Sequence, residues 1–434
     1  MPKDDSAWIP AESAEWHDNK TGLWFDWKQI DHSSPREMEP SERKKGVKIT
    51  CTEKMLIYPT SAQKTILLGW FEDFKKMYNI ANEYLDKLLM SQVHNVPKLP
   101  IAEALRHLNF KELRSGPLKE KRDALLSSST INAHMVDQAI CHCVAKYKTC
   151  LANLKNRHCR QFRIKNWIGE KRNEILILES QEFSRSRNAI CSTKLGDMKS
   201  ERPLSEVKTT STLVYDRYLK KWVLMIPVKR EGLKITSKSP DKRCGCDPGI
   251  RTFMTVYSEE AVHEFANDPG STFKKYYDKQ DQLKSHLHQG KMNKKQYMKA
   301  FTRSSDKLTH IVTDMHWKVS KTLCMKYDKI TIGKLGSQSI ISNKNKNQLA
   351  KITKRVSNTL SHYKFREKLL HQARKYGSIV DEKDEYMTTK TCSTCHNVNE
   401  VGKSKIYRCK FCRIVVGRDV NAARNICNGI PTRK

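Results

Sequence analysis

The stretch Cys392-Ser-Thr-Cys395, followed by Cys409-Lys-Phe-Cys412 and Arg418-Asp419-Val420-Asn421-Ala422-Ala423-Arg424, decides how the C-terminal part of this sequence folds. Two Cys-x-x-Cys pairs separated by thirteen residues have the spacing of a zinc ribbon, in which four thiolates surround one Zn²⁺. Two unrelated redox or buried cysteine pairs are the alternative, which this spacing disfavours. A zinc ion with four sulfur ligands is structural, so the chemistry is expected at the flanking carboxylates.

The composition is that of a strongly basic globular chain. Its 434 residues include 81 Lys and Arg against 47 Asp and Glu, a formal net charge of +34. This surplus predicts a polyanionic partner, because each neutralised phosphate releases counterions, whereas solubility alone needs far less charge. The opening Met1-Pro-Lys-Asp-Asp is unlike a signal peptide, and no run of about 18 apolar residues predicts a membrane span. The other cysteines are expected to stay reduced, with a second metal site at Cys141/Cys143 or Cys244/Cys246 as a lesser alternative.

The first half of the chain predicts an arm and a mixed domain. Residues 1–47 are acidic and hold four of the eight tryptophans, so this arm either docks on the basic surface or is solvated. Residues 48–65 and 155–240 predict a β-barrel, which a helical lobe at 66–154 interrupts. The expected elements are strands at Lys48–Tyr58, Gln161–Lys165 and Glu174–Leu178, a hairpin of Ser211–Tyr215 with Trp222–Val228, a helix capped by Thr60 or Ser61, a helix at Asn132–Leu154, and a loop at Ser115–Ser129.

The second half, at 241–390 and 413–434, predicts an α/β domain with the ribbon, 391–412, inserted near its end. Arg243–Ile250 is expected to form a strand and then a turn, and further strands are expected at Phe253–Tyr257, Lys329–Leu335 and Ser378–Tyr386. The other expected elements are two helices within Ser271–Lys326 that break near Gly290, a loop at Ser342–Asn347, a helix at Thr359–Tyr376 that Gly377 ends, and a helix at Val420–Cys427.

Asp247 and Asp419 have positions expected of metal-ligating acids. Asp247 lies in a strand just before Pro-Gly, and Asp419 opens a helix whose N-terminal dipole tolerates an anion. Two Mg²⁺ ions about 3.5–4 Å apart can activate a water and stabilise the leaving oxygen of a phosphodiester, and they need two or three carboxylates. Taken singly, the first is equally well a turn acid and the second a helix N-cap.

In this order, the features resemble the RNA-guided nucleases of the TnpB and Fanzor group, relatives of type V CRISPR effectors. The resemblance covers about residues 48–430 and implies a RuvC-like nuclease domain of the ribonuclease H fold, a wedge-like barrel and a helical recognition lobe. It also implies a guide RNA, double-stranded target DNA and catalytic Mg²⁺, with Asp247 as the first metal ligand and Asp419 as the last. The matching motifs are Asp247-Pro-Gly, Asp314-Met-His-Trp-Lys318, Thr389-Lys-Thr-Cys-Ser-Thr-Cys395 and Arg418-Asp-Val-Asn-Ala-Ala423, with weaker matches at Ile57-Tyr-Pro-Thr60, Gln63 and Trp70-Phe71.

The sequence departs from the TnpB pattern at the second acid. Typical members have a glutamate in an Ile-Glu-x-Leu strand, where this chain reads Ile332-Gly333-Lys334-Leu335. Fanzor members carry a glutamate in Glu-Tyr-x-Thr-Ser-Lys-x-Cys, and this chain reads Glu385-Tyr-Met-Thr-Thr-Lys-Thr-Cys392, which favours the Fanzor branch and Glu385. Glu382 is the second choice, because in an unbroken strand its side chain would point to the opposite face. A solvated acid at the end of a strand is the plain alternative for Glu385.

The resemblance therefore predicts a monomeric RNA-guided DNA endonuclease that recognises a short target-adjacent motif and cuts through Asp247, Glu385 and Asp419 with two Mg²⁺. The zinc ligands are Cys392, Cys395, Cys409 and Cys412. The expected location is the nucleus of a eukaryotic host, with a viral origin allowed, or otherwise the cytoplasm or nucleoid. A catalytically silent guided binder, which Gly333 supports, and a zinc-ribbon DNA-binding protein without a guide are the alternatives.

Overall fold

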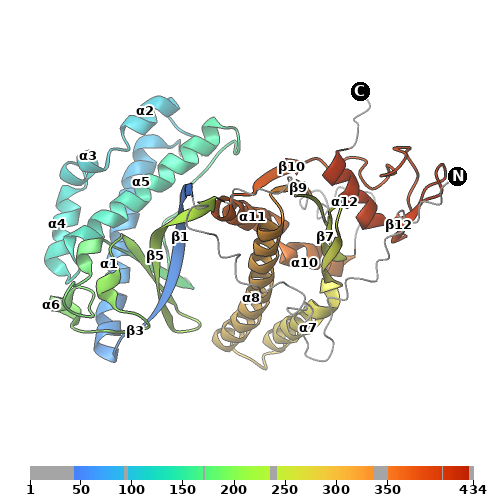
Figure 1. Ribbon diagram of the computed structural model, residues 1–434. Coiled ribbons are helices and arrows are strands. Elements are labelled where there is room, and N and C mark those ends of the chain that lie inside the picture. Colours follow the sequence, from blue (N-terminus) through green and yellow to red (C-terminus); the bar gives the residue numbers. More distant parts are fainter. Residues whose placement is uncertain are drawn as a thin grey trace. The chain divides into compact units, whose positions relative to one another are not determined.

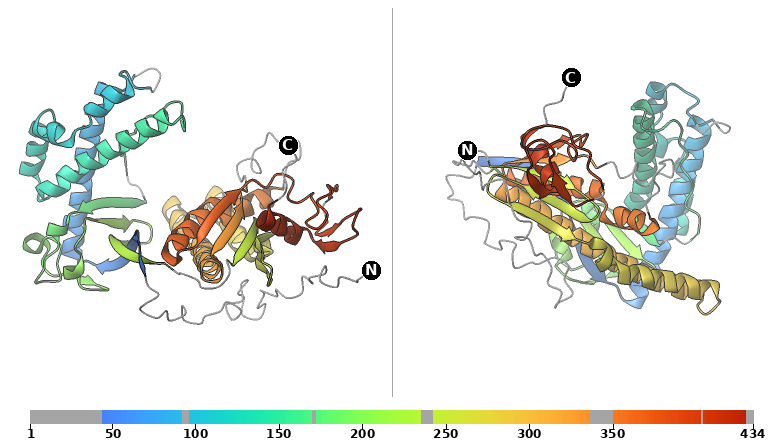
Figure 2. Two further views of the ribbon diagram at one scale, coloured as in Figure 1. Left: turned by 45° about the horizontal axis from the view of Figure 1, so that its top comes forward. Right: turned by 90° about the vertical axis from the view of Figure 1, so that its right-hand side faces the viewer.

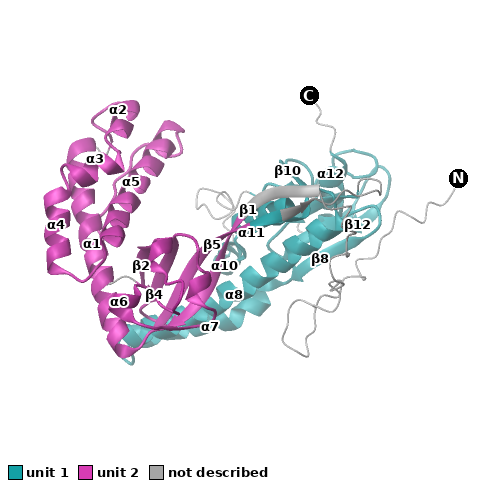
Figure 3. Ribbon diagram, turned by 60° about the vertical axis from the view of Figure 1, so that its left-hand side comes forward, with its two compact units in different colours: residues 1–49, 230–434 teal, residues 50–229 magenta. Residues whose placement is uncertain are grey.

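The computed structural model describes residues 44–91, 96–169, 172–234, 242–335, 350–402 and 404–429. The chain divides into two compact units, one of which is Thr50–Lys229 and the other of which contains Arg230–Lys434 (Figure 3). Most of the predicted acidic arm and the predicted loop at Ser342–Asn347 lie outside the described residues. No helix in the described ranges combines the length and apolarity that a membrane crossing needs.

The Thr50–Lys229 unit packs helices against a sheet around one hydrophobic core. Thr60, one of the two predicted capping residues, caps α1, because its hydroxyl accepts from the Gln63 N–H while the Gln63 side chain accepts from the Thr60 N–H. Trp70 and Tyr147 are among the largest buried side chains of this core. The helices are α1 (Ser61–Leu89), α2 (Ile101–Arg106), α3 (Phe110–Ser115), α4 (Lys119–Ser128), α5 (Ala133–Lys155) and α6 (Ser192–Leu195).

The predicted loop at Ser115–Ser129 is wrong over most of its length, because α4 occupies Lys119–Ser128. The segment looked polar, yet Leu118 and Leu125 are buried in the core. The residues between them mostly have high helix propensity, so burial of the two leucines is enough to stabilise a helix there.

The sheet of this unit has the strand order β2-β4-β5-β1-β3. The predicted hairpin is confirmed, since β4 and β5 pair antiparallel, with Tyr215 opposite Trp222. The described pairings form an ordered sheet with β2 and β3 at its ends, so its closure into a barrel stays a prediction. The strands are β1 (Lys44–Tyr58), β2 (Asn173–Leu178), β3 (Lys199–Ser200), β4 (Ser211–Asp216) and β5 (Lys221–Lys234).

The predicted strand at Gln161–Lys165 is wrong, because no ladder forms there. Side-chain amides of α1 bind this backbone instead. Asn82 donates to the Ile164 carbonyl at 3.1 Å, and Asn79 both donates to the Trp167 carbonyl and accepts from its N–H. The alternating apolar residues therefore pack along a helix rather than beside another strand.

The sheet of the second unit has the order β10-β9-β6-β7-β8. Strands β6, β7 and β8 pair antiparallel in sequence, whereas β9 is parallel to β6 and β10 is parallel to β9. Strand β8 had no counterpart among the predicted elements. The strands are β6 (Arg243–Pro248), β7 (Thr252–Tyr257), β8 (Val262–Asn267), β9 (Lys329–Gly333) and β10 (Ile379–Lys383).

The two faces of this sheet are buried by different helices (Figure 1). The larger core, with Phe253 and Phe365, joins one face to α7 (Pro269–His288), α8 (Lys294–Lys326), α10 (Lys351–Leu360) and α11 (His362–Tyr376). Helix α12 (Arg418–Asn428) covers β6 and β7 through a smaller cluster that includes Tyr257 and Val420. Figure 2 shows α7 and α8 as a long helical hairpin, which confirms the predicted break near Gly290.

Two predicted elements of this unit have different limits. The helix predicted at Thr359–Tyr376 is divided at Ser361, where a positive φ of 48° ends α10 and begins α11, and Gly377 ends α11 as expected. The strand predicted at Ser378–Tyr386 ends at Lys383, so Glu385 lies just beyond β10. A short hairpin of β11 (Ile406–Arg408) and β12 (Val415–Gly417) carries the second cysteine pair.

Candidate functional site

The three parallel strands β6, β9 and β10 have their carboxyl ends at the same edge of the sheet. Asp247 is the penultimate residue of β6, Gly333 is the last residue of β9, and Glu385 follows the end of β10 by two residues. In sheets with parallel strands, ligands bind outside these carboxyl ends, so the topology alone gathers the two acids and the glycine. Helix α12 brings Asp419 to the same edge, as its second residue.

One cavity of about 930 Å³ is lined by all three predicted acids, Asp247, Glu385 and Asp419. Burial raises the pKa of Asp247, and the charges of Asp419 and Glu385 raise it further, while Arg418 opposes the shift. Burial beside two other carboxylates disfavours the anionic form of Asp247 unless cations neutralise it. The cavity therefore has the electrostatics of a divalent-cation site.

One carboxylate oxygen of Glu385 receives no hydrogen bond from the residues that the structure describes. Its Oε1 is buried and has no hydrogen-bond partner within the described part of the chain. Burial raises the pKa of Glu385 to about 7, to which the charge of Asp384 adds and which Arg366 opposes. A buried carboxylate oxygen without a hydrogen-bond donor is suited to bind a Mg²⁺ ion, because Mg²⁺ prefers oxygen ligands.

Gly333 makes room for the Glu385 side chain. A Cβ atom at residue 333 would lie 2.4 Å from Glu385 Oε1, 2.7 Å from its Cγ and 2.9 Å from its Cδ. These separations are far below van der Waals contact, so any larger residue at 333 would displace the glutamate. The Glu385 side chain, which comes from the segment after β10, thus fills the space next to the end of β9.

Asp419 is held against the sheet by a close approach of α12 to β6. A Cβ atom at Gly245 would lie 2.2 Å from the Ala423 carbonyl oxygen and 2.4 Å from the Cys427 nitrogen, so only glycine lets the helix pack at this depth. Residues two apart on a strand share a face, so Asp247 lies on the same side of β6 as Gly245. The Arg418 guanidinium donates to Asp419 at 3.2 Å.

The acids are spaced around the cavity rather than clustered at one point. Within the described ranges, only the cysteine group has three or more candidate ligand atoms that all lie within 4.8 Å of one another. Wider spacing is compatible with carboxylates that flank two cations about 3.5–4 Å apart. The donor chemistry and the unsatisfied oxygen therefore fit Mg²⁺, and the assignment of Asp247, Glu385 and Asp419 as its ligands stays a prediction.

Glu382, the second choice for the middle acid, does not line this cavity. It pairs with Ile332 in the β9–β10 register, and one of its oxygens lies 3.9 Å from Arg366 Nε. The alternation argument that separated it from Glu385 does not apply, because β10 ends before Glu385.

Sequence reasoning missed five further charged residues of the cavity wall, which are Arg251, Asp268, Lys274, Asp278 and Arg418. Arg418 is next to Asp419 and entered the sequence analysis only as part of a motif. Asp268 directly precedes α7, and Asp278 lies within α7. Asp278 is already paired with Lys274 at 2.6 Å. The signal available for Asp268 was its place before Pro269, where an acid commonly precedes a helix.

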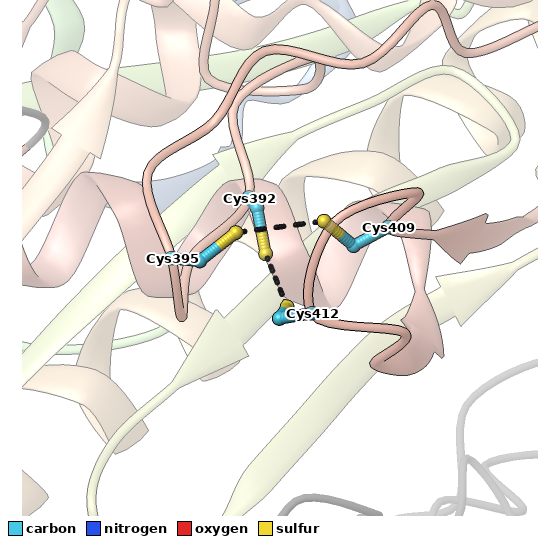
Figure 4. A group of neighbouring side chains, drawn as sticks. All are labelled: Cys392, Cys395, Cys409 and Cys412. Carbon is cyan, nitrogen blue, oxygen red and sulfur yellow. Dashed lines mark hydrogen bonds between the residues drawn. The ribbon is translucent and has the colours of Figure 1, made fainter.

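The four predicted cysteines converge from two loops (Figure 4). Cys392 and Cys412 have their sulfur atoms 3.6 Å apart, and Cys395 and Cys409 have theirs 3.5 Å apart. A tetrahedron with Zn–S bonds of about 2.3 Å has edges of about 3.8 Å, so the cluster has the size that zinc requires. Burial opposes ionisation of Cys409, but the backbone N–H groups of Cys412 and Phe411 outweigh it and lower the pKa of its thiol. The residues therefore fit a zinc ion held as a closed, structural site.

Replacing Cys409 with serine should remove the bound metal. We expect zinc content measured by mass spectrometry to fall from about one per chain to none, because a structural site needs all four thiolates. Hydrogen exchange at residues 391–412 should accelerate, since metal binding and local folding are coupled. Cys159→Ser, outside the cluster, is the matched control. Full zinc retention by Cys409→Ser would remove Cys409 from the ligand set.

The raised acid pKa values predict a characteristic pH response. Because the pKa of Glu385 lies at about 7 without metal, a cation can bind only by displacing a proton as the pH falls. Divalent-cation binding should therefore weaken between about pH 8 and about pH 6, and a higher cation concentration should move the midpoint to lower pH. Titration of Mn²⁺ at several pH values measures this. A binding affinity that is constant over this range would contradict the assignment of Glu385 as a ligand.

The chain is similar to proteins of large DNA viruses over most of its length. A TnpB-like protein of Acanthamoeba polyphaga mimivirus is 33% identical over 451 residues, which cover 97% of this chain and 85% of the relative. A putative transposase of Paramecium bursaria Chlorella virus 1 is 24% identical and covers 86% of this chain and 85% of its own length. Family models match at residues 362–426, described as a Cas12f1-like TNB domain, and at 225–342, described as a probable transposase. A solved Cas12f1 complex with single-guide RNA and target DNA aligns over 88% of this chain and 99% of its own, at 16% identity and a TM-score of 0.35.

Proposed function

This chain belongs to the TnpB-like protein family, and we propose that it is an RNA-guided DNA endonuclease of the Fanzor type. In this proposal the protein binds a guide RNA and a short motif beside the target, and base pairing between guide and target reads the rest. Asp247, Glu385 and Asp419 would hold two Mg²⁺ ions, which would supply the chemistry for hydrolysis of the phosphodiester. The RuvC-like nuclease is assigned to 241–390 and 413–434, and the zinc ribbon to 391–412.

One observation carries the proposal. The cavity at the carboxyl ends of β6, β9 and β10 gathers the carboxylates of Asp247, Glu385 and Asp419, and the buried Oε1 of Glu385 has no hydrogen-bond partner among the described residues. A carboxylate group built only for stability would be neutralised by basic residues or hydrogen-bond donors, as Asp137 is by Arg114 and Arg122. Of the charged residues near these acids, Arg418 opposes the raised pKa of Asp247 and Arg366 opposes that of Glu385, yet both pKa values stay raised.

The net charge of +34 supports the nucleic-acid part of the proposal. An RNA–DNA heteroduplex presents a phosphate backbone that a basic protein recognises largely independently of sequence. In the assignment proposed here, the sheet at 48–65 and 155–240 is the wedge and the helices at 66–154 are the recognition lobe. The protein acts as a monomer in the nucleus of a eukaryotic cell, whether the gene belongs to that cell or to a virus that infects it.

Sequencing the nucleic acid that co-purifies with the full-length protein tests the guide directly. The proposal expects one discrete RNA species that resists nuclease treatment while bound, and a matched plasmid that is cut with Mg²⁺ only when that RNA is present. A heterogeneous RNA background with no effect on plasmid cutting would instead favour a DNA-binding protein without a guide.

Gly333 favours one other candidate, a guided binder that does not cut. The residue lacks the acid that occupies this position in typical members of the family. That candidate predicts the same bound RNA and the same target binding as the endonuclease, with no nicking of the matched plasmid in either Mg²⁺ or Mn²⁺. The contact between Gly333 and Glu385 is the reason for preferring the endonuclease.

A further inference from the structure

Helix α12 carries two buried asparagines that the metal site does not use. Asn421 is fully buried and Asn425 is 3% exposed. Side chains four residues apart lie on the same face of a helix, so the two amides point at the same neighbouring segment. That segment is the loop 385–393, which connects Glu385 to the first cysteine pair.

Both amides bind the same two backbone carbonyls. Asn425 Nδ2 donates to the Thr388 and Thr391 carbonyl oxygens, at 2.8 Å each. Asn421 Nδ2 donates to the Thr391 carbonyl at 2.8 Å and to the Thr388 carbonyl at 3.5 Å. A carbonyl oxygen has two lone pairs, so these donors use the full accepting capacity of both carbonyls.

The Asn421 side chain also reaches the predicted zinc site. Its Oδ1 accepts from the backbone N–H of Ser393 at 2.9 Å, and Ser393 lies between Cys392 and Cys395. This bond fixes the orientation of the amide, because its oxygen must face the N–H and its nitrogen the two carbonyls. Asn421 thus joins α12 both to the loop and to the first cysteine pair.

Thr388 continues the connection to the catalytic acid. Its hydroxyl donates to the Glu385 carbonyl at 2.9 Å, and its N–H donates to the same oxygen at 3.2 Å. Thr388 is 4% exposed, so these bonds are shielded from water. A continuous set of hydrogen bonds therefore runs from Glu385 through Thr388 to α12, whose second residue is Asp419.

We propose that Asn421 and Asn425 form an amide clamp that holds Glu385 in register with Asp419, with the zinc-binding loop as its outer anchor. Asn421, Asn425 and Thr388 are positioning residues, because none of them lines the cavity and Thr388 binds only the backbone carbonyl of Glu385, not its carboxylate. Their effect is on the affinity of the acid site for divalent cations. The inference rests on the proposed function, since it requires that these acids bind cations.

A titration of Mn²⁺ into the full-length protein, followed by the electron paramagnetic resonance signal of free Mn²⁺, tests the clamp. Subtracting the binding of Asp247→Asn isolates the acid site from other bound ions. Thr388→Val removes only the hydroxyl bond to Glu385 and keeps the shape of the side chain, so it should weaken Mn²⁺ binding roughly 10-fold, as loss of an outer-shell partner does. Thr388→Ser keeps the hydroxyl and should bind Mn²⁺ like the wild type.

Asn425→Asp provides a second arm on the helix itself. It turns two donated bonds into contacts between a carboxylate and two carbonyl oxygens, so it should weaken Mn²⁺ binding at least as much as Thr388→Val. Asn428→Ala, at an exposed position at the end of the same helix, is the matched control and should have no effect. If Asn425→Asp does not fold, the comparison of Thr388→Val with Thr388→Ser still tests the clamp.

The outcomes separate the clamp from the proposed function. If Thr388→Val binds Mn²⁺ as tightly as the wild type and Asp247→Asn binds it less tightly, the clamp is wrong but the proposed function stands. Wild-type protein that binds Mn²⁺ no better than Asp247→Asn overturns both. A purely structural role for Thr388 would lower the melting temperature of Thr388→Val without changing its Mn²⁺ affinity, which is again the result that contradicts the clamp.

Discussion

Asp247→Asn is expected to abolish cleavage of a guide-matched plasmid, with a loss of more than about 10³-fold, because metal-ion catalysis contributes several kcal/mol and about 1.4 kcal/mol is a factor of ten. Asparagine keeps the shape of the side chain and removes the charge that a divalent cation needs. Guide RNA binding should be unchanged. Cleavage rates measured under single-turnover conditions with saturating RNA provide the test.

The same variant should be more stable to unfolding than the wild type, although it does not cut. The raised pKa of Asp247 means that ionising it in the folded, metal-free protein is unfavourable, and this cost is present above its unfolded pKa and grows as pH rises towards the folded value. Asp247→Asn should therefore melt at a higher temperature than wild type near neutral pH without divalent cations. Asp381→Asn, whose carboxylate faces Lys329 at 3.6 Å and not the cavity, is the matched control and should cut normally. Full activity in Asp247→Asn would show that the active site lies elsewhere.

Gly333→Ala should lower cleavage by about 10²-fold, on the scale of losing one group that orients a metal site. The added methyl group meets three side-chain atoms of Glu385, each within 2.9 Å, and nothing nearer. A flexible side chain can swing aside, so the protein should fold with nearly its original melting temperature while Glu385 leaves its position. Single-turnover cleavage and a thermal melt of the same sample measure both effects.

Two further variants make the Gly333 test specific. Gly69→Ala lies in α1, where a Cβ atom meets nothing within 4 Å, so it controls for a general effect of replacing glycine. Gly333→Glu combined with Glu385→Ala supplies a carboxylate from β9 into the space that the removed side chain vacates. This pair should cut better than Glu385→Ala alone. No recovery, together with normal cutting by Gly333→Ala, would contradict a shared position for the two side chains.

Short-range patterns in the sequence predicted much of the site. The cysteine spacing is a local property of two tight turns, and the four cysteines do form a group that could hold a metal. Asp247 and Asp419 sit beside turn and helix-start signals, and the structure brings both to one cavity. The sequence also predicted the two elements that carry them, the strand β6 and the helix α12.

The failures arise where distant contacts decide the local structure. Gln161–Lys165 has the alternation of a strand, but side chains of Asn79 and Asn82, some 80 residues earlier, bind the backbone of the segment that contains it. The end of β10 depends on its partner β9, which stops at Gly333, so the sequence of β10 alone could not place Glu385 outside the strand. The asparagine contacts of α12 join segments about 30 residues apart and have no periodic signal.

The central claim is that Glu385 completes a divalent-cation site with Asp247 and Asp419. Cleavage of the guide-matched plasmid by Glu385→Gln beside Glu382→Gln tests it most directly, since the two variants change the same group three residues apart. The account predicts that Glu385→Gln fails to cut, while Glu382→Gln, whose carboxylate lies near Arg366 outside the cavity, cuts at the wild-type rate. Normal cutting by Glu385→Gln would contradict it.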